Sequence, residues 1–490
     1  MQLEVLGLNA HIHNVLRNKF GYTSFRAGQE EIIESVLNKE DVLAILPTGM
    51  GKSLCYQLPG YMLPHSILII SPLLSLMQDQ VEQLKKMGEK RVVAINSFLN
   101  PSERHALLKR LTSYKFIFLS PEMMWQEHVQ AELMKLPLSL VVVDEAHCIS
   151  QWGYDFRPDY LRVGEWVRQT SRPPILALTA TATANVMNDI SSLLHMSNPT
   201  VHVQSLDRSN IRYATYEVDS QEEKYENIKR QIKETDSPGI LYTQSRKKAD
   251  NYAKKLSAEG IRIASYHAGM EPLDRMFIQQ QFLQNELDWV CATNAFGMGV
   301  HKDDVRQIIH DHIPSSVANY TQEVGRAGRD GGDSLATLFY TKDDEDHSIF
   351  VATSDFPEEE NVNYYIESMN NGVTQSQLVS QGLMSETHVR MISYWLARKS
   401  AEETIVIFEE LRKQKVKQIF QMKEILTNPL CIREQIIRVF GQQLIDRPDN
   451  CCSKCGLNRD EFLSSTNNLG NKLVLQHWEV RMAKIFGRLD

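Results

Sequence analysis

Three separate groups of residues in this chain carry side chains that could bind a nucleotide and split off its terminal phosphate. The first is the segment Thr48-Gly49-Met50-Gly51-Lys52-Ser53. Its glycines let consecutive backbone N–H groups turn toward one point, where a following helix N-terminus adds positive potential. Lys52 can then reach the terminal phosphates, and the Ser53 hydroxyl can ligate Mg²⁺. Leu46 stands where the full P-loop pattern has glycine, so the match is to the shorter GxGKS form. Taken alone, the segment could also be a glycine turn beside a surface lysine.

The second group is the carboxylate pair Asp144-Glu145, which directly follows the apolar run 138–143. Such a run of leucine and β-branched residues is typical of a parallel strand buried on both faces, and open α/β sheets bind ligands where these strands end. Asp144 is expected to hold Mg²⁺, and Glu145 is expected to polarise the attacking water. A solvated acidic turn is the alternative for an isolated pair, but this pair follows the glycine loop at a normal βαβ distance.

The third group lies far downstream, in 320–331, and contains Gln322, Arg326 and Arg329. Two arginines three residues apart share one face if the segment is helical. A guanidinium is permanently charged and forked, which suits a terminal phosphate presented across a cleft. One of the two is predicted to be an arginine finger, with Arg329 favoured, and a pair of surface arginines is the alternative. No single loop can hold all three groups, so the chain is predicted to close two lobes around one nucleotide.

With these residues in view, the chain resembles the RecQ family of superfamily 2 DNA helicases. The likeness runs from residue 10 to 345 and more loosely to 460. Its motifs, in the family's order, are FGYTSFRAGQEEII at 20–33, SPLLSLMQDQ at 71–80, DEAHCISQWGYDFRPDY at 144–160, LALTATAT at 176–183, ILYTQSRKKAD at 240–250, ASYHAGM at 264–270 and ATNAFGMGVHKDDVRQIIH at 292–310.

The resemblance implies an α/β fold of two RecA-like, doubly wound parallel-sheet lobes followed by a helical and zinc-binding C-terminal region. It implies an ATP- and Mg²⁺-dependent helicase that moves 3′→5′ on single-stranded DNA and unwinds duplexes in DNA repair, recombination or replication-fork maintenance. In such an enzyme Arg26 packs on adenine and Gln29 hydrogen-bonds its edge. The segment 71–80 would touch the DNA backbone. The alternatives are an RNA helicase of the DEAD-box class and a DNA-binding or annealing scaffold that unwinds weakly.

The segment after the carboxylate pair is rich in aromatic residues. Trp152 and Phe156 are predicted to stack on unpaired bases, which is worth about 1–3 kcal/mol per base, and Arg157 could pair with a phosphate. Two buried core aromatics are the alternative, since large rings are usually inside. The family commonly has histidine at the position of Tyr154 and aspartate at that of His301. Neither position holds phosphate or metal in this mechanism.

The seven cysteines fall into two classes. Cys55, Cys148 and Cys291 stand singly in apolar or motif segments, where a buried free thiol is expected. The other four crowd near the C-terminus, and the Cys-x2-Cys pair among them fits one knuckle of a tetrahedral Zn²⁺ site. The predicted ligands are Cys431, Cys451, Cys452 and Cys455. Asp449 is the alternative to Cys451, because the side chains of adjacent cysteines diverge.

Composition agrees with a cytosolic enzyme of several domains, nucleoid-associated if bacterial. A chain of 490 residues with 42% hydrophobic and 23% charged residues suits two lobes and an accessory region, and it shows no apolar run long enough for a membrane span. The net charge of −8 predicts moderate, salt-sensitive DNA affinity through a local groove. Expected partners are single-stranded and forked DNA and a single-stranded-DNA-binding protein, with the chain itself a monomer.

The predicted divisions are a first lobe at 1–205, a second lobe at 206–350, a helical linker at 351–425, a zinc module at 426–460 and an amphipathic tail at 461–490. The acidic run 358–360 is expected to belong to a linker that leaves the second lobe. Within the helical part, 373–400 is predicted to form a helix-turn-helix-like unit around Gly382, with Ser385 or Thr387 capping its second helix. The segment after Cys455 is too short for the winged-helix and HRDC domains of the family, so a short form is expected.

Overall fold

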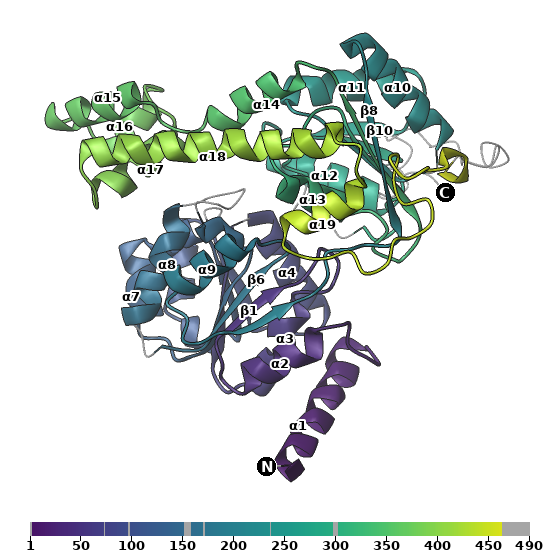
Figure 1. Ribbon diagram of the computed structural model, residues 1–490. Coiled ribbons are helices and arrows are strands. Elements are labelled where there is room, and N and C mark those ends of the chain that lie inside the picture. The colour runs from purple at the N-terminus through teal and green to yellow at the C-terminus, as the bar shows by residue number, and fades with distance from the viewer. Residues whose placement is uncertain are drawn as a thin grey trace, which may run out of the picture.

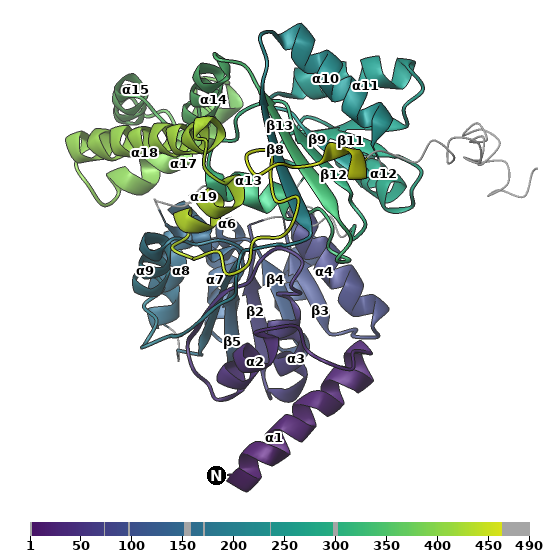
Figure 2. The same cartoon turned by 45° about the vertical axis from the view of Figure 1, so that its right-hand side comes forward.

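The structure is a computed structural model that describes residues 2–72, 74–96, 99–150, 158–169, 172–235, 237–296 and 302–462. It contains two lobes, each built on a parallel sheet, and a helical region that extends from the second lobe over the first (Figure 1). The N-terminal helix α1 (Gln2–Val15) projects from the first lobe on the side away from the second (Figure 2). In the described part of the chain, no helix is both long and apolar enough to cross a membrane.

The first lobe is a doubly wound sheet with strand order β3-β4-β2-β5-β6-β1-β7, and all its strand pairs are parallel. Alternate residues of one strand pack on opposite faces: Leu43 and Ile45 join one apolar cluster, and Val42 and Ala44 join the other. This period of two explains why the strands are apolar throughout, since helices cover both faces. The strands are β1 (Val42–Ile45), β2 (Ser66–Ile70), β3 (Val92–Ile95), β4 (Phe116–Leu119), β5 (Leu138–Val143), β6 (Ile175–Thr179) and β7 (Thr200–Val203).

The helices of the first lobe precede β1 or connect the strands, and they cover the sheet. They are η1 (Leu16–Phe20), α2 (Gln29–Leu37), α3 (Leu54–Met62), α4 (Leu74–Lys86), α5 (Pro101–Leu108), η2 (Leu111–Ser113), α6 (Pro121–Met124), α7 (Glu127–Leu133), η3 (Ala146–Ile149), α8 (Pro158–Gln169) and α9 (Ala184–Leu193).

The second lobe repeats this plan with six parallel strands in the order β10-β11-β9-β12-β13-β8. Its strands are β8 (Ile211–Glu217), β9 (Gly239–Tyr242), β10 (Ile263–Tyr266), β11 (Trp289–Ala292), β12 (Gln307–His310) and β13 (Ser334–Tyr340). Its helices are α10 (Gln221–Glu234), α11 (Arg246–Ala258), α12 (Pro272–Leu283), α13 (Val317–Val324) and α14 (Asp344–Thr353).

The helical region consists of α15 (Glu359–Asn370), α16 (Gln375–Ser380), α17 (Glu386–Leu396) and α18 (Ala401–Thr427). Helix α18 joins two cores, because Phe408 packs with α15–α17 while Met422 packs in the core of the second lobe. The acidic run 358–360 stands at the start of a helix, and Glu358 caps α15 through a capping box with Asn361. Ser385, rather than Thr387, caps α17 by accepting a hydrogen bond from the backbone N–H of His388.

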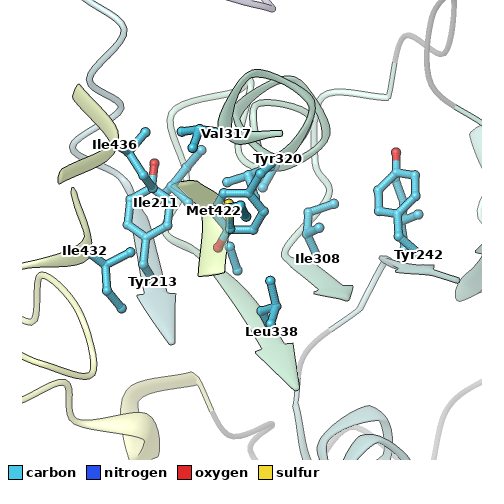
Figure 3. Close-up of a cluster of buried hydrophobic side chains, with 14 of the residues drawn as sticks. Ile211, Tyr213, Tyr242, Ile308, Val317, Tyr320, Leu338, Met422, Ile432 and Ile436 are labelled. Atoms are coloured by element: carbon cyan, nitrogen blue, oxygen red, sulfur yellow. The ribbon is translucent and has the colours of Figure 1, made fainter. Parts of the chain in front are cut away.

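The cysteine-rich segment that follows is built into the second lobe. Helix α19 (Ile432–Val439) and the last described helix η4 (Arg459–Phe462) flank it. Figure 3 shows Ile432 and Ile436 of α19 beside Tyr213 of β8 and near Tyr320 of α13. Cys452 also forms an isolated parallel bridge with Tyr213. The segment therefore shares a core with the lobe and is not a separately packed module.

Candidate nucleotide site

The glycine loop has the predicted strand–turn–helix form. Strand β1 leads into the turn, and Ser53 stands at the start of α3. Gly49 has φ 91° and Gly51 has φ 72°, a left-handed conformation that glycine adopts without strain. A Cβ at Gly49 would lie 3.1 Å from Cγ of Arg329, in the second lobe. Both the backbone conformation and the closeness of the two lobes therefore require glycine here.

Arg26 and Gln29 lie against the backbone of this loop. The Arg26 guanidinium donates to the carbonyl of Gly49, and Gln29 Nε2 donates to the carbonyls of Met50 at 2.8 Å and Gly51 at 3.1 Å. Gln29 Oε1 in turn accepts from the Arg26 backbone N–H at 2.9 Å. The loop that would hold phosphates is thus tied directly to the pair of residues expected to bind the base.

The carboxylate pair lies at the end of β5, as predicted, and faces the loop lysine. Lys52 Nζ is 3.2 Å from Glu145 Oε1. Burial would raise the pKa of Glu145, but the positive charges of Lys52, His147 and Arg326 outweigh it and lower this pKa. Burial raises the pKa of Asp144, and the charge of Glu145 adds to this rise. Of the two carboxyl groups, Glu145 therefore has the lower pKa and ionises more readily, while the neighbouring Asp144 has the higher pKa.

The two arginines come from the second lobe, but not from a helix. Helix α13 ends at Val324, and Arg326 and Arg329 lie in the turn that follows, so the predicted shared helical face is wrong. Gly328, with φ 52°, is one reason that the helix cannot continue. Burial lowers the pKa of Arg329 to about 10, and the neighbouring charge of Arg326 acts in the same direction. Gln322 is buried in the last turn of α13.

All three nucleotide-site groups therefore meet between the lobes. Arg326 is close enough to Glu145 to lower its pKa, and Arg329 packs on Gly49. This arrangement places positive charge on both sides of the loop and the carboxylate pair, which is what the terminal phosphate of a nucleotide needs during cleavage.

Motif reasoning missed three residues at this site. His147 Nδ1 lies 3.4 Å from Glu145 Oε2 and 2.8 Å from Thr179 Oγ1, and the Tyr160 hydroxyl donates to the Asp144 carbonyl at 3.0 Å. Arg208 lies between the lobes and contacts loops of both. His147 and Tyr160 lie within the motif at 144–160, so the motif itself is a signal by which these two residues could be found. Arg208 lies between the quoted motifs.

The four C-terminal cysteines form one cluster in which all the sulfurs lie within 4.8 Å of one another. The Sγ–Sγ distances are 3.7 Å from Cys431 to Cys451, 4.0 Å from Cys431 to Cys452 and 3.5 Å from Cys452 to Cys455. A tetrahedral ion with Zn–S bonds of about 2.3 Å needs sulfurs about 3.8 Å apart, so the donor set fits Zn²⁺. Cys451, and not Asp449, stands with the other three thiols among the described residues.

Trp152 and Phe156, which are predicted to stack on bases, and Arg157, which is predicted to pair with a phosphate, lie outside the described residues, as do Tyr154 and His301. A cavity of about 550 Å³ opens between the two lobes and the helical region. It is lined from the first lobe by Glu122 and Asp159, from the second by Thr243 and Thr293, and from the helical region by Arg390 and Lys415.

Comparison with known proteins defines the class. Residues 26–190 match the DEAD/DEAH box helicases, and residues 223–331 match the helicase conserved C-terminal domain. The crystal structure of the DUF1998 helicase MrfA bound to DNA superposes with a TM-score of 0.58 at 20% identity, over 70% of this chain and 52% of that chain. At so low an identity the likeness shows the fold alone. The fold and the two matched domains are those of a two-lobed superfamily 2 helicase, and the predicted architecture is confirmed.

Closer relatives define the family. A Bacillus subtilis (strain 168) protein named "Probable ATP-dependent DNA helicase RecS" is 39% identical over 97% of this chain and 98% of its own length. The "ATP-dependent DNA helicase RecQ" of Haemophilus influenzae is 40% identical over 67% of this chain and 53% of that protein, so the chain spans about half the length of this relative. The chain belongs to the RecQ family of ATP-dependent DNA helicases, as its motifs predict.

Proposed function

We propose that this protein is a 3′→5′ DNA helicase that uses ATP hydrolysis to move along single-stranded DNA and separate duplexes. The observation that carries the proposal is the meeting of Lys52, Glu145 and the arginine-bearing turn between two lobes of one chain. A site divided in this way is completed only when the lobes close, so each hydrolytic cycle can be coupled to a movement of one lobe against the other. Family membership supports DNA as the substrate, and the polarity follows from the family resemblance.

In this mechanism each side chain has a separate role. The backbone N–H groups of 48–51 and Lys52 bind the phosphates, while Ser53 and Asp144 hold Mg²⁺, which would neutralise charge on the phosphates. Glu145, kept ionised by its cationic neighbours, orients and polarises the attacking water. From the second lobe, Gln322, Arg326 and Arg329 complete the site, and one of the arginines stabilises the charge that develops on the transferred phosphoryl group.

The adenine base is proposed to bind beside Arg26 and Gln29. Both side chains already contact the backbone of the phosphate loop, so base binding and phosphate binding would be linked through the carbonyls of residues 49–51. A nucleotide with another base would lose the hydrogen bond to Gln29 and would also disturb this loop. This linkage accounts for a preference for ATP among the nucleoside triphosphates.

The cavity between the lobes and the helical region is the proposed entrance for single-stranded DNA. Two of its hydroxyl side chains, Thr243 and Thr293, follow β9 and β11 at the carboxyl edge of the second sheet, where open α/β sheets bind ligands. Trp152 and Phe156 are the proposed stacking residues and Arg157 the proposed phosphate contact. Forked DNA would present the single strand that this path requires.

We further propose that the four clustered cysteines hold one structural Zn²⁺. Three of the four side chains are buried, and three belong to the core cluster of the second lobe, so the ion would fix α19 against β8 and would not take part in hydrolysis.

Because both halves of the nucleotide site come from one chain, the protein is proposed to work as a monomer. A single-stranded-DNA-binding protein, which occupies the same substrate, is the expected protein partner.

ATP hydrolysis with single-stranded DNA, duplex DNA, RNA or no nucleic acid tests this function. We expect single-stranded DNA to stimulate hydrolysis strongly, and Glu145→Gln to abolish the stimulated rate while retaining nucleotide binding. Displacement of a labelled strand from substrates with a 3′ or a 5′ overhang then tests the polarity. Stimulation mainly by RNA would replace this proposal with an RNA helicase, and hydrolysis indifferent to all nucleic acids would contradict both. DNA-stimulated hydrolysis without strand displacement would indicate a translocase or annealing scaffold.

A further inference from the structure

A single arginine side chain contacts nucleotide-site loops of both lobes. Arg208 lies in the segment 204–210 that connects β7 to β8, and hence the first lobe to the second. Its Nη1 donates to the carbonyls of Thr48 at 3.3 Å and Gly325 at 3.5 Å, and its Nη2 donates to the carbonyls of Ala327 at 3.1 Å and Gly328 at 2.6 Å. One guanidinium therefore spans the phosphate loop and the turn that carries Arg326 and Arg329.

The contacts of Arg208 are to backbone carbonyls and not to carboxylates. Among the residues that the structure describes, no carboxylate lies within ion-pair distance of its guanidinium. Burial lowers its pKa, and the nearby charge of Arg26 acts in the same direction. A half-buried cation that binds main-chain oxygens contributes geometry more than charge neutralisation, and the rigid fork of a guanidinium suits this role better than the ammonium of lysine.

The loops around Arg208 are closely packed. The cavity beside it has a volume of only about 20 Å³ and is lined by residues of both lobes, including Thr48, Thr181, Thr321 and Gly325. This space holds about one water molecule. A Cβ at Gly325 would lie 3.4 Å from Cβ of Thr48, so the two loops are already in van der Waals range. A small shift of the connecting segment would therefore displace one loop relative to the other.

The connecting segment is itself held from the side of the cysteine cluster. The Arg433 guanidinium, buried at 1% exposure, binds the carboxylate of Asp207 and the carbonyl of Arg208, and its Nε donates to Cys451 Sγ at 3.3 Å. Gln442 accepts a hydrogen bond from the Leu206 backbone N–H at 2.9 Å. The backbone that carries Arg208 is thus fixed to the C-terminal segment of the second lobe.

We propose that Arg208 is a positioning residue that sets the arginine-bearing turn of the second lobe against the phosphate loop of the first. When the loop binds a nucleotide, the shift of its Thr48 carbonyl is transmitted through the Arg208 guanidinium to the carbonyls of 325–328. Arg326 and Arg329 then reach the terminal phosphate in the correct position. Arg208 touches neither substrate nor reacting atoms in this scheme, and the inference rests on the hydrolytic site described under the proposed function.

Two substitutions in the full-length protein test this role. Arg208→Gln removes the fork and the charge, and Arg208→Lys keeps the charge without the fork. The matched control is Arg230→Gln, which makes the same change at an exposed position on α10. For each protein we would measure kcat and KM for ATP hydrolysis with and without single-stranded DNA, equilibrium binding of a fluorescent ATP analogue, and the thermal unfolding midpoint.

We expect Arg208→Gln to lower kcat at least tenfold while the analogue binds within about threefold of wild type, because an interaction needed in the transition state is lost and the phosphate contacts remain. Arg208→Lys should recover part of kcat, and the Arg230 variant should match wild type. If Arg208→Gln does not fold, the lysine variant decides, since a positioning role predicts a reduced kcat with unchanged analogue binding.

Three results would overturn the inference. One is a wild-type kcat in Arg208→Gln, and another is a raised KM with unchanged kcat, which would assign Arg208 to ground-state binding. The third is an equal loss of kcat in Arg208→Gln and Arg208→Lys, accompanied by a lowered unfolding midpoint in both. That result would indicate a purely structural role. If the wild-type protein hydrolyses ATP without responding to DNA, the proposed function fails, but the Arg208 comparison is still made on the DNA-independent rate.

Discussion

Glu145 adopts a backbone conformation that residues with a Cβ rarely hold. Its φ of 48° and ψ of 48° lie in the left-handed region, where an L-residue other than glycine, asparagine or aspartate costs about 1–2 kcal/mol. The surrounding structure imposes this conformation: the Glu145 N–H donates to Asp144 Oδ1 at 3.0 Å, and η3 begins at the next residue. The strain turns the carboxylate toward Lys52 at the end of β5, where the water-activating group is proposed to work.

This strain predicts a stability difference between two inactive variants. Glu145→Gly and Glu145→Ala both remove the carboxylate, so both should lose at least about a hundredfold in the rate of ATP hydrolysis. Only glycine relieves the backbone strain, so Glu145→Gly should have the larger free energy of unfolding, by about 1 kcal/mol. Denaturant unfolding of the two variants side by side measures this difference. Equal stabilities would show that the left-handed conformation carries no cost here.

At the residue scale, the sequence was sufficient where chemistry fixes a local pattern. The positions of the GxGKS segment and the Asp144-Glu145 pair, each at the end of a strand, could be predicted because the pattern that indicates them spans only a few residues. Arg208 could not be found in this way, because its partners lie in two loops of two lobes and are main-chain carbonyls, which every residue supplies. By contrast, the choice of Cys451 over Asp449 as the fourth ligand could be made from the sequence, and the structure places Cys451 in the cluster of four thiols.

At the scale of elements, helix α4 of the first lobe contacts helix α12 of the second across the cleft through the side chain of Asp79. Ionising this carboxyl group is unfavourable in the folded protein. Asp79 of α4 is half-buried, and its Oδ2 accepts a hydrogen bond from Gln279 Nε2 of α12 at 3.4 Å. Burial raises the pKa of Asp79 to about 6, and the hydrogen bond from Gln279 only partly opposes this rise. The folded protein therefore retains a proton on Asp79 at pH values where the unfolded chain has lost it.

The direction of the resulting pH dependence is fixed by this raised pKa. The contribution of Asp79 to stability is full below about pH 4 and is lost as the pH rises through about 6. The thermal unfolding midpoint of Asp79→Asn should therefore equal that of wild type near pH 4 and exceed it by roughly 2 °C at pH 7.5. The expected difference is small because Asp79 is partly solvated. Thermal unfolding of both proteins from pH 4 to 8 tests this. A difference that does not change with pH would contradict the assignment to Asp79.

The cysteine cluster makes a second prediction at this scale. Because three of its cysteines lie in the core of the second lobe, loss of the metal should loosen that lobe and not merely a surface turn. Metal analysis should find one Zn²⁺ per chain, and Cys455→Ser should lower both the zinc content and the unfolding midpoint, the latter by at least about 5 °C. Lys454→Ser, an exposed neighbour in the same turn, should change neither. Full stability of the protein after chelation and removal of zinc would contradict a structural ion.

The elements themselves were predictable to different extents. Continuous apolar runs such as 138–143 foretold the buried strands, because a strand covered on both faces has no polar side to show. The turn after α13 could not be predicted from the spacing of Arg326 and Arg329, which is helical, because the helix ends at Gly325 and the chain turns at Gly328. The acidic run 358–360 is predicted only as part of a linker, and the structure places it at the start of α15, where negative charges interact favourably with the positive end of the helix dipole.

At the scale of the whole molecule, the helical region bridges both lobes. The C-terminal half of α18 is embedded in the second lobe, while α17 lies over α8 of the first (Figure 1). Arg390 of α17 pairs with Asp159 and with Glu122 Oε1 at 3.3 Å, and Arg398 pairs with Glu165 Oε1 at 3.2 Å. Any opening of the cleft must therefore break or slide a contact made largely of ion pairs, beside the cavity proposed to admit DNA.

The ion-paired contact between the helical region and the first lobe should be weak enough to open, and its strength should fall as the salt concentration rises. Solvent-exposed ion pairs contribute only about 0–1 kcal/mol each, and ionic strength screens them. Hydrogen exchange in α8 and α17 should therefore rise between 50 and 500 mM NaCl in the wild-type protein. Arg390→Glu combined with Arg398→Glu would place two negative charges against three carboxylates, so exchange in both helices should already be fast at low salt.

The unfolding midpoint of this double variant should change little, because the apolar cluster of the helical region, which includes Trp395 and Phe408, and the cores of both lobes keep their contacts. A double variant with Arg230→Glu and Lys454→Glu, at exposed positions remote from α8, controls for net charge. If α8 and α17 stay protected in the Arg390 and Arg398 variant, apolar packing around Leu161 holds the helical region on the first lobe. The helical region would then stay attached to both lobes as they move. The cleft could open only if α18 bends.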